Sequence, residues 1–291
     1  MYLYVNGEIK PDHDVRISPY EHGFLYGAGL FETFRTYGGE PFLLKDHLAR
    51  LEAGARELAV ELPASFEEEI RQAAADLLEA NQLEDAYFRL NVSGGAEGVG
   101  LPAAIYGEPL TILYIKPLPD FLPEQKEVRT LKLRRNSPEG AVRRKSHHYL
   151  NNILAKREIQ EHGNTEGIFL TENGVLSEGI TSNLFFVKKD QLYTPDESCG
   201  CLNGITSRFV KAIAEELGLR VVEGRFSLKK ALEADEVFLT NSIQEIVPVS
   251  AWDEHFFPGS SGEKTTLLQS VYRYAADRTE NPNRKPGGND E

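Results

Sequence analysis

Lys145 is the residue of this sequence that is best suited to nucleophilic or basic chemistry. It directly follows Arg143 and Arg144 and precedes an apolar segment that is expected to form a helix. Neighbouring positive charges disfavour the ammonium form of a lysine, and a neutral lysine can act as a nucleophile or as a base. Basic runs are also typical of a solvated surface, and this stretch alone favours the surface interpretation.

Three further polar features fall at the ends of expected elements. Glu178 precedes a glycine and a Ser/Thr/Asn cluster beside an apolar strand, where it is either a partly buried carboxylate or an ordinary turn residue. Gly204, Ile205 and Thr206 begin an amphipathic helix, whose first N–H groups and hydroxyls can bind a phosphate or form an ordinary cap. Ser242 follows the end of a strand, a common position for ligand contacts in α/β proteins.

Together these features match the requirements of pyridoxal 5′-phosphate. That cofactor needs a lysine for covalent attachment, a carboxylate that keeps its pyridine nitrogen protonated, and a binding site for its phosphate. We therefore predict a pyridoxal phosphate enzyme. No metal site is predicted, because no carboxylate or thiol cluster accompanies the seven histidines at ligand spacing.

The acidic composition argues against nucleic acid as a partner. The 291 residues include 32 Lys and Arg and 45 Asp and Glu, which gives a formal net charge of −13, and such a chain repels a phosphate backbone. Cys199 and Cys201 are too close together for a Cys-x-x-Cys site, and no apolar run reaches the roughly 18 residues of a membrane span. We expect a cytoplasmic protein that acts on a small-molecule substrate.

The order of expected elements predicts two domains. Residues 1–116 are expected to form a small N-terminal α/β domain, with helices at 45–58 and 66–81. Residues 117–125 contain three prolines and form the expected interdomain loop, since proline interrupts regular structure.

Residues 126–278 are expected to form the larger C-terminal domain. Its predicted elements include a helix at 149–162, a final strand at 236–240 and a last helix at 264–278. The polar tail, residues 279–291, is expected to be disordered.

The chain also carries a series of motifs in a characteristic order, and with them it resembles the class IV, or fold type IV, pyridoxal phosphate enzymes. This group contains branched-chain aminotransferases, D-amino acid aminotransferases and 4-amino-4-deoxychorismate lyases. The resemblance extends from Tyr4 to about Ala275, and the matching motifs are 22–27 with 29–33, 47–51, Lys145, 177–179 with Ser182 and Asn183, 204–206, and 245–249. It implies an α/β (α+β) fold with a small α/β domain and a larger pseudo-barrel domain, and a homodimer.

The resemblance also implies roles for individual residues. Lys145 would carry the cofactor and move protons, and Glu178 would pair with the pyridine nitrogen. Arg50 would bind the 5′-phosphate with help from Ile205, Thr206 and Ser242; without the resemblance, Arg50 would be interpreted as a solvated helix residue.

Two further roles follow from the same resemblance. Tyr149 would contact the phenolic oxygen of the cofactor, and Thr33 would assist catalysis. Arg89, Arg143 and Arg144 are candidates to bind substrate carboxylates, with a structural role for each as the alternative.

Within the group, the sequence is most similar to aminodeoxychorismate lyases. The segment 90–98 lacks the Arg and His that D-amino acid aminotransferases use to bind the substrate carboxylate, and segment 134–140 resembles the lyases. The implied activity is elimination of pyruvate from 4-amino-4-deoxychorismate to give 4-aminobenzoate for folate biosynthesis. The alternatives are an aminotransferase for branched-chain or D-amino acids and a cofactor-free binding protein with the same fold.

Overall fold

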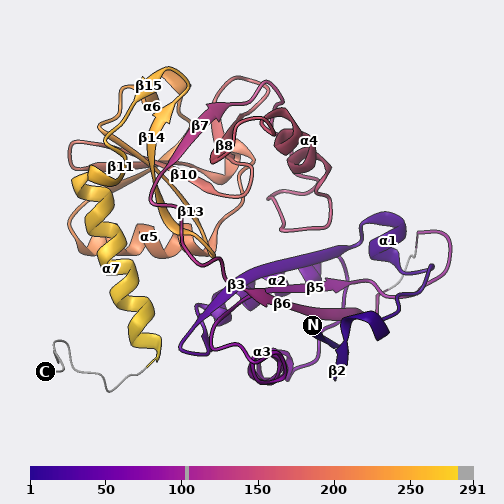
Figure 1. Ribbon diagram of the computed structural model, residues 1–291. Coiled ribbons are helices and arrows are strands. Elements are labelled where there is room, and N and C mark those ends of the chain that lie inside the picture. The colour runs from indigo at the N-terminus through magenta and orange to yellow at the C-terminus, as the bar shows by residue number, and fades with distance from the viewer. Residues whose placement is uncertain (102–104, 281–291) are drawn as a thin grey trace, which may run out of the picture.

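The computed structural model describes residues 1–101 and 105–280, which form two β-sheets with helices packed against them (Figure 1). The strands that precede residue 118 build the first sheet, and the strands that follow residue 125 build the second. The boundaries of the two domains stay a prediction. No helix among the described residues is long and apolar enough to cross a membrane.

The first sheet is antiparallel and has the strand order β2-β1-β6-β5-β3-β4. Its core contains the stacked rings of Phe34 and Phe88, whose centroids lie 5.4 Å apart, together with Leu48, Ile70 and Leu77 from two covering helices. The strands are β1 (Tyr2–Val5), β2 (Glu8–Pro11), β3 (Gly29–Tyr37), β4 (Glu40–Pro41), β5 (Ala86–Ser93) and β6 (Leu110–Pro117), and the helices are α1 (His22–Tyr26), α2 (Leu44–Glu57) and α3 (Phe66–Asn81).

Strand β3 determines which side chains of this sheet are available for chemistry. Successive side chains of a strand point to opposite faces. Leu30 and Phe34 therefore pack into the core with α2 and α3, whereas Phe31 and Thr33 line a cavity on the other face. The predicted helices at 45–58 and 66–81 thus correspond closely to α2 and α3, which cover the core face.

The second sheet is mixed and has the order β12-β11-β10-β13-β14-β7-β8-β9, with β15 paired to β14. The pairs β7–β8, β7–β14 and β11–β12 are parallel, and the other pairs are antiparallel. The strands are β7 (Lys126–Thr130), β8 (Thr165–Leu170), β9 (Leu176–Gly179), β10 (Asn183–Lys188), β11 (Gln191–Pro195), β12 (Arg220–Gly224), β13 (Glu236–Asn241), β14 (Glu245–Trp252) and β15 (His255–Phe256). The edge strand β9 curls back against β10 and β11, which gives the sheet its partly closed, barrel-like form.

Four helices accompany the second sheet, and the long α7 runs along its outer side (Figure 1). Leu268 and Tyr272 of α7 pack with Val210 and Ile213 of α5, because both helices present an apolar stripe to the sheet. The helices are α4 (Leu150–Glu158), α5 (Ile205–Glu216), α6 (Leu228–Leu232) and α7 (Glu263–Glu280).

Three predictions about this half of the chain need correction. Helix α4 ends at Glu158 instead of residue 162, and β13 is not the final strand, because β14 and β15 follow it. The helix α7 continues to Glu280, so residues 279 and 280 belong to it and not to a disordered tail. The rest of the predicted tail, residues 281–291, lies outside the described residues.

Candidate active site

A cavity of about 710 Å³ lies between the two sheets and is lined by residues of both. All eight residues predicted to form the site line this single cavity. They are Thr33, Arg50, Lys145, Tyr149, Glu178, Ile205, Thr206 and Ser242. They come from positions up to 209 residues apart (242 − 33), so the fold, and not the local sequence, brings them together.

Lys145 lies in the loop before α4, and this loop is attached to the end of β3. The Lys145 carbonyl accepts a hydrogen bond from the Phe31 N–H at 2.8 Å, and the His147 N–H donates to the Gly29 carbonyl at 2.9 Å. The Nζ atom of Lys145 lies 4.5 Å from the centroid of the Phe31 ring. The amine is therefore held over an apolar surface at a defined place in the cavity.

The environment of Lys145 favours its neutral form. Burial, reinforced by the charge of Arg50, lowers the pKa of the amine to about 8, although Glu32 and Glu178 act in the opposite direction. Desolvation disfavours a charged ammonium, and a nearby cation adds to the effect. A lysine with such a pKa has a substantial neutral fraction near neutral pH and can act as a nucleophile or a base.

Glu178 on β9 is a buried carboxylate with fixed partners. Its Oε1 atom lies 2.9 Å from Nε and 2.7 Å from Nη2 of Arg135, and its Oε2 atom accepts a hydrogen bond from the Leu202 N–H at 2.9 Å. Arg135 in turn donates to the side-chain oxygens of Asn151 and Asn152. Because the guanidinium supplies a full positive charge, Glu178 can remain ionised although it is buried.

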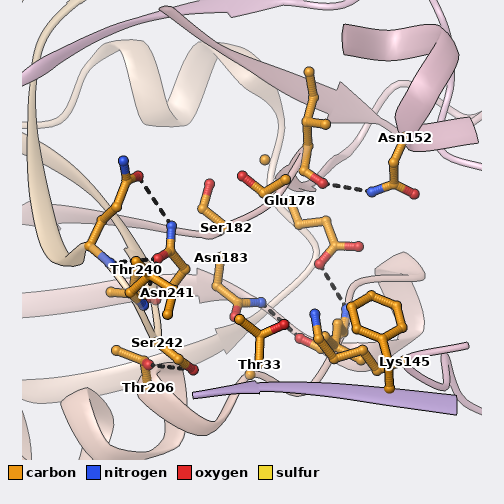
Figure 2. A pocket seen from close by; sticks show the side chains of 18 of the residues that line it. Thr33, Lys145, Asn152, Glu178, Ser182, Asn183, Thr206, Thr240, Asn241 and Ser242 are labelled. Atoms are coloured by element: carbon orange, nitrogen blue, oxygen red, sulfur yellow. Dashed lines mark hydrogen bonds between the residues drawn. The ribbon is translucent and has the colours of Figure 1, made fainter. Parts of the chain in front are cut away.

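The first turn of α5 forms the opposite side of the cavity. Figure 2 shows Lys145 and Glu178 on one side and the hydrogen-bonded Thr206–Ser242 pair on the other, with 3.4 Å between the two hydroxyl oxygens. Gly204 is the N-cap of α5, and no side chain caps its free N–H groups. The Oγ1 atom of Thr240 is buried without a hydrogen-bond partner among residues 1–101 and 105–280. These donors suit a phosphate group.

Space at this helix terminus depends on the missing side chain of Gly204. A Cβ atom at that position would lie 1.9 Å from Oδ1 of Asn183. The Nδ2 atom of Asn183 donates to the Leu202 carbonyl at 2.7 Å, so Asn183 also fixes the segment that leads into α5. The glycine thus allows Asn183 and the helix terminus to approach each other closely.

Arg50 reaches the same part of the cavity from α2 and is held by a buried carboxylate. Its Nε and Nη2 atoms bind Oε1 and Oε2 of Glu32 at 2.8 and 2.6 Å, and its Nη1 atom donates to the Asn203 carbonyl at 2.7 Å. Oε2 of Glu32 also lies 2.7 Å from Nδ1 of His47. Arg50 therefore stands beside the α5 terminus in a fixed orientation, with a charge that is only partly balanced.

The remaining predicted residues also lie at the cavity. Tyr149 packs edge-on against Phe31 with 5.5 Å between the ring centroids, and burial raises the pKa of its phenol. Thr33 extends from β3 into the cavity (Figure 2).

The three arginine candidates for substrate binding differ in their partners. Arg143 donates to the backbone carbonyls of Gly200 and Asn136, and Arg144 is 2.7 Å from the Glu57 carboxylate. Arg89 stacks on the Phe31 ring at 3.7 Å, and its Nε donates to Asn91. Its two terminal nitrogens have no hydrogen bond within the described parts of the chain, so Arg89 is the candidate best placed to receive a ligand carboxylate.

Sequence reasoning assigned no role to Arg135, Glu32 or His47. Each acts through a partner distant in the sequence: Arg135 is 43 residues from Glu178, and Glu32 is 18 residues from Arg50. The available signal was a charged residue within an otherwise apolar segment, as with Glu32 in β3, where a carboxylate must find a buried partner.

The site fits the predicted cofactor. A lysine with a lowered pKa, a buried carboxylate held ionised, and a cationic helix terminus with an unsatisfied hydroxyl surround one cavity. These groups correspond to the attachment point, the partner of the pyridine nitrogen and the phosphate site that pyridoxal phosphate needs.

Comparisons with known proteins agree with this geometry. The family model described as amino-transferase class IV matches residues 29–252. Aminodeoxychorismate lyase of Bacillus subtilis (strain 168) is 45% identical over 274 residues, which cover 93% of each chain.

Two solved structures are also similar to this chain. The 4-amino-4-deoxychorismate lyase of Pseudomonas aeruginosa has a TM-score of 0.84 at 32% identity and covers 94% of this chain and 99% of its own. A branched-chain amino acid aminotransferase from T.th., complexed with N-(5′-phosphopyridoxyl)-L-glutamate, has a TM-score of 0.86 at 28% identity and covers 97% and 95%. The predicted resemblance and the predicted fold type IV architecture are confirmed, and the chain belongs to the amino-transferase class IV family.

Proposed function

We propose that this protein is a pyridoxal 5′-phosphate-dependent lyase that converts 4-amino-4-deoxychorismate into 4-aminobenzoate and pyruvate, a reaction that supplies folate biosynthesis. The observation that carries the proposal is the 45% identity, over 93% of both chains, to an aminodeoxychorismate lyase. The cavity supports it, because it holds a lysine, a carboxylate and a phosphate site in the arrangement that the cofactor needs.

The residues of this chain would hold the cofactor at three points. Lys145 is the attachment point and Glu178 the partner of the pyridine nitrogen. Arg50, the first turn of α5 at Ile205 and Thr206, and the Ser242 hydroxyl hold the phosphate. When bound, the cofactor supplies an electron sink for the substrate carbon that carries the amine.

Lys145 is the group that moves protons. Its lowered pKa lets the amine take the proton from C4 of the substrate, and the same amine can return a proton to the departing enolpyruvyl oxygen as the carbon–oxygen bond breaks. Thr33 and Tyr149 are close enough to the cavity to assist by hydrogen bonding. Arg89 binds one substrate carboxylate with its terminal nitrogens.

A homodimer in the cytoplasm completes the proposal. Phe24, Tyr20 and Ile17 near the start of β3 are 77%, 53% and 50% exposed, which suits a surface that a second copy covers. Cys199 and Cys201 are buried free thiols, as expected in a reducing compartment.

The deciding experiment supplies the purified holoenzyme with 4-amino-4-deoxychorismate and measures pyruvate and 4-aminobenzoate. Equal amounts of the two products are expected. A parallel reaction offers branched-chain or D-amino acids with 2-oxoglutarate, because the similarity to a branched-chain aminotransferase makes transamination the second candidate. Amine transfer without pyruvate release would overturn the lyase proposal, and a protein that stays colourless with pyridoxal phosphate would indicate a non-enzymatic role.

A further inference from the structure

The cavity is strongly cationic although the chain as a whole is acidic. Two carboxylates and nine Lys or Arg side chains line it, whereas the chain carries a net charge of −13. The two carboxylates, Glu166 and Glu178, are already bound by groups of the protein. Cations gathered against the overall charge of a protein create a local field that attracts anions.

Two of these lysines flank the segment that joins the sheets. Lys116 lies at the end of β6 and Lys126 begins β7, and Leu118 and Pro119 between them also line the cavity. Figure 1 shows this segment passing from the first sheet to the second. The two amines therefore belong to different sheets and face one cavity at its linker end.

Neither lysine has a close ion pair among residues 1–101 and 105–280. The Nζ atom of Lys116 lies 4.3 Å from the centroid of the Tyr87 ring, a contact without a counter-charge. The Nζ atom of Lys126 donates to Oε1 of Gln244 at 2.9 Å, and its nearest carboxylate oxygen, Oε2 of Glu166, is 3.8 Å away.

The burial of Lys126 makes this incomplete pairing costly. The side chain is 11% exposed, and burial lowers the pKa of the amine even though Glu166 opposes the shift. Oε1 of Glu166 accepts hydrogen bonds from the N–H and hydroxyl of Thr181 and from the hydroxyl of Ser182, so much of its charge is directed elsewhere. An anion arriving in the cavity would complete the pairing of Lys126.

We infer that Lys126, assisted by Lys116, binds a second carboxylate of the substrate at the linker end of the cavity. The inference rests on the proposed function, whose substrate carries two carboxylates, and it assigns one of them to a site other than Arg89. A carboxylate held by both lysines would also tie the first sheet to the second while the substrate is bound. Lys126 is the stronger ligand of the two, because Lys116 is exposed and water screens its charge.

The test uses the holoenzymes of the variants Lys126→Gln, Lys126→Arg and Lys116→Gln. Loss of a charge-assisted contact predicts a KM for 4-amino-4-deoxychorismate that rises about 10-fold or more in Lys126→Gln and less in Lys116→Gln, with a smaller change in kcat. Lys126→Arg keeps the charge and should restore most of the affinity. Lys229→Gln is the matched control, because Lys229 is 85% exposed on α6 and does not line the cavity.

Product inhibition gives a second, independent measurement. Each product retains one carboxylate, so Lys126→Gln should weaken inhibition by either 4-aminobenzoate or pyruvate several-fold and leave the other within about twofold. An unchanged KM in both Gln variants, or equal weakening of both products, would overturn the assignment. A wild-type protein that releases no pyruvate would instead refute the proposed function. Because Lys116 is exposed, Lys116→Gln should fold even if Lys126→Gln does not.

Discussion

Nε and Nη2 of Arg135 both bind Oε1 of Glu178, at 2.9 and 2.7 Å. The pair is buried at the wall of the cavity, and Leu202 holds the second carboxylate oxygen through its N–H. The carboxylate proposed to meet the pyridine nitrogen is therefore oriented by the protein before any ligand arrives.

Replacement of Arg135 by Met should be strongly destabilising. It leaves Glu178 buried without its cation, and removing one partner of a buried ion pair typically costs about 3–5 kcal/mol. Chemical denaturation should show this loss in the free energy of unfolding, and cofactor absorbance should show weaker binding. Arg157→Met, on the exposed side of α4, is the control and should change stability by less than about 0.5 kcal/mol. Equal stability of the two variants would contradict the role of Arg135.

Attachment of pyridoxal phosphate to the apoprotein should depend on pH through Lys145. The pKa of about 8 means that the neutral amine increases as the pH rises from about 7 to 9. The rate of reconstitution, followed by absorbance, should rise over this interval and level off above it. A rate that climbs only near pH 10 would show that Lys145 titrates as an ordinary lysine. Lys145→Ala should abolish the absorbance change, whereas Lys229→Ala should leave it intact.

Glu32 should contribute acid-sensitive stability. Burial by itself would raise the pKa of this carboxyl, but Arg50 and His47 outweigh burial and lower the pKa to about 2. The unfolded-state value is about 4.3, so the stabilisation is complete above that pH and is lost as the pH falls from about 4.3 to 2. The contribution is about 3 kcal/mol.

The variant Glu32→Gln isolates this contribution. It should be less stable than the wild type at pH 7, and the difference should shrink as the pH falls through that interval. It should also bind pyridoxal phosphate more weakly, because Arg50 loses its orientation. Urea denaturation across pH measures the first effect and cofactor titration the second. A pH-independent difference in stability would contradict the predicted ionisation of Glu32.

Replacement of Gly204 by Ala should damage the phosphate site. The added Cβ atom would lie 1.9 Å from Asn183 Oδ1, so Asn183 or the start of α5 must move. Overpacking of this kind costs about 1–3 kcal/mol, and cofactor affinity should fall with it. Gly163→Ala is the matched control, because no atom lies within 4 Å of a Cβ at that position. Equal cofactor affinity in the two variants would show that the α5 terminus tolerates the shift.

Local patterns in the sequence were sufficient for the elements whose signals are local. The apolar period of 66–81 predicts α3, which spans Phe66–Asn81, because one face of this helix must be buried. The motifs carrying Lys145, Glu178 and Gly204–Thr206 are contiguous, so they could be identified without coordinates. Strand β14 was missed because a buried strand without alternation resembles other apolar runs.

The sequence by itself thus determined which residues are chemically able to form the site and the family to which they belong. Only the tertiary structure decided how those residues are held: Arg135 on Glu178, Glu32 on Arg50, and Lys126 facing the cavity without a close carboxylate. The physical reason is that periodicity and capping act over a few residues, whereas ion pairing depends on which side chains the strands and helices bring face to face. An acidic chain could therefore build a cationic cavity that its net charge of −13 does not reveal.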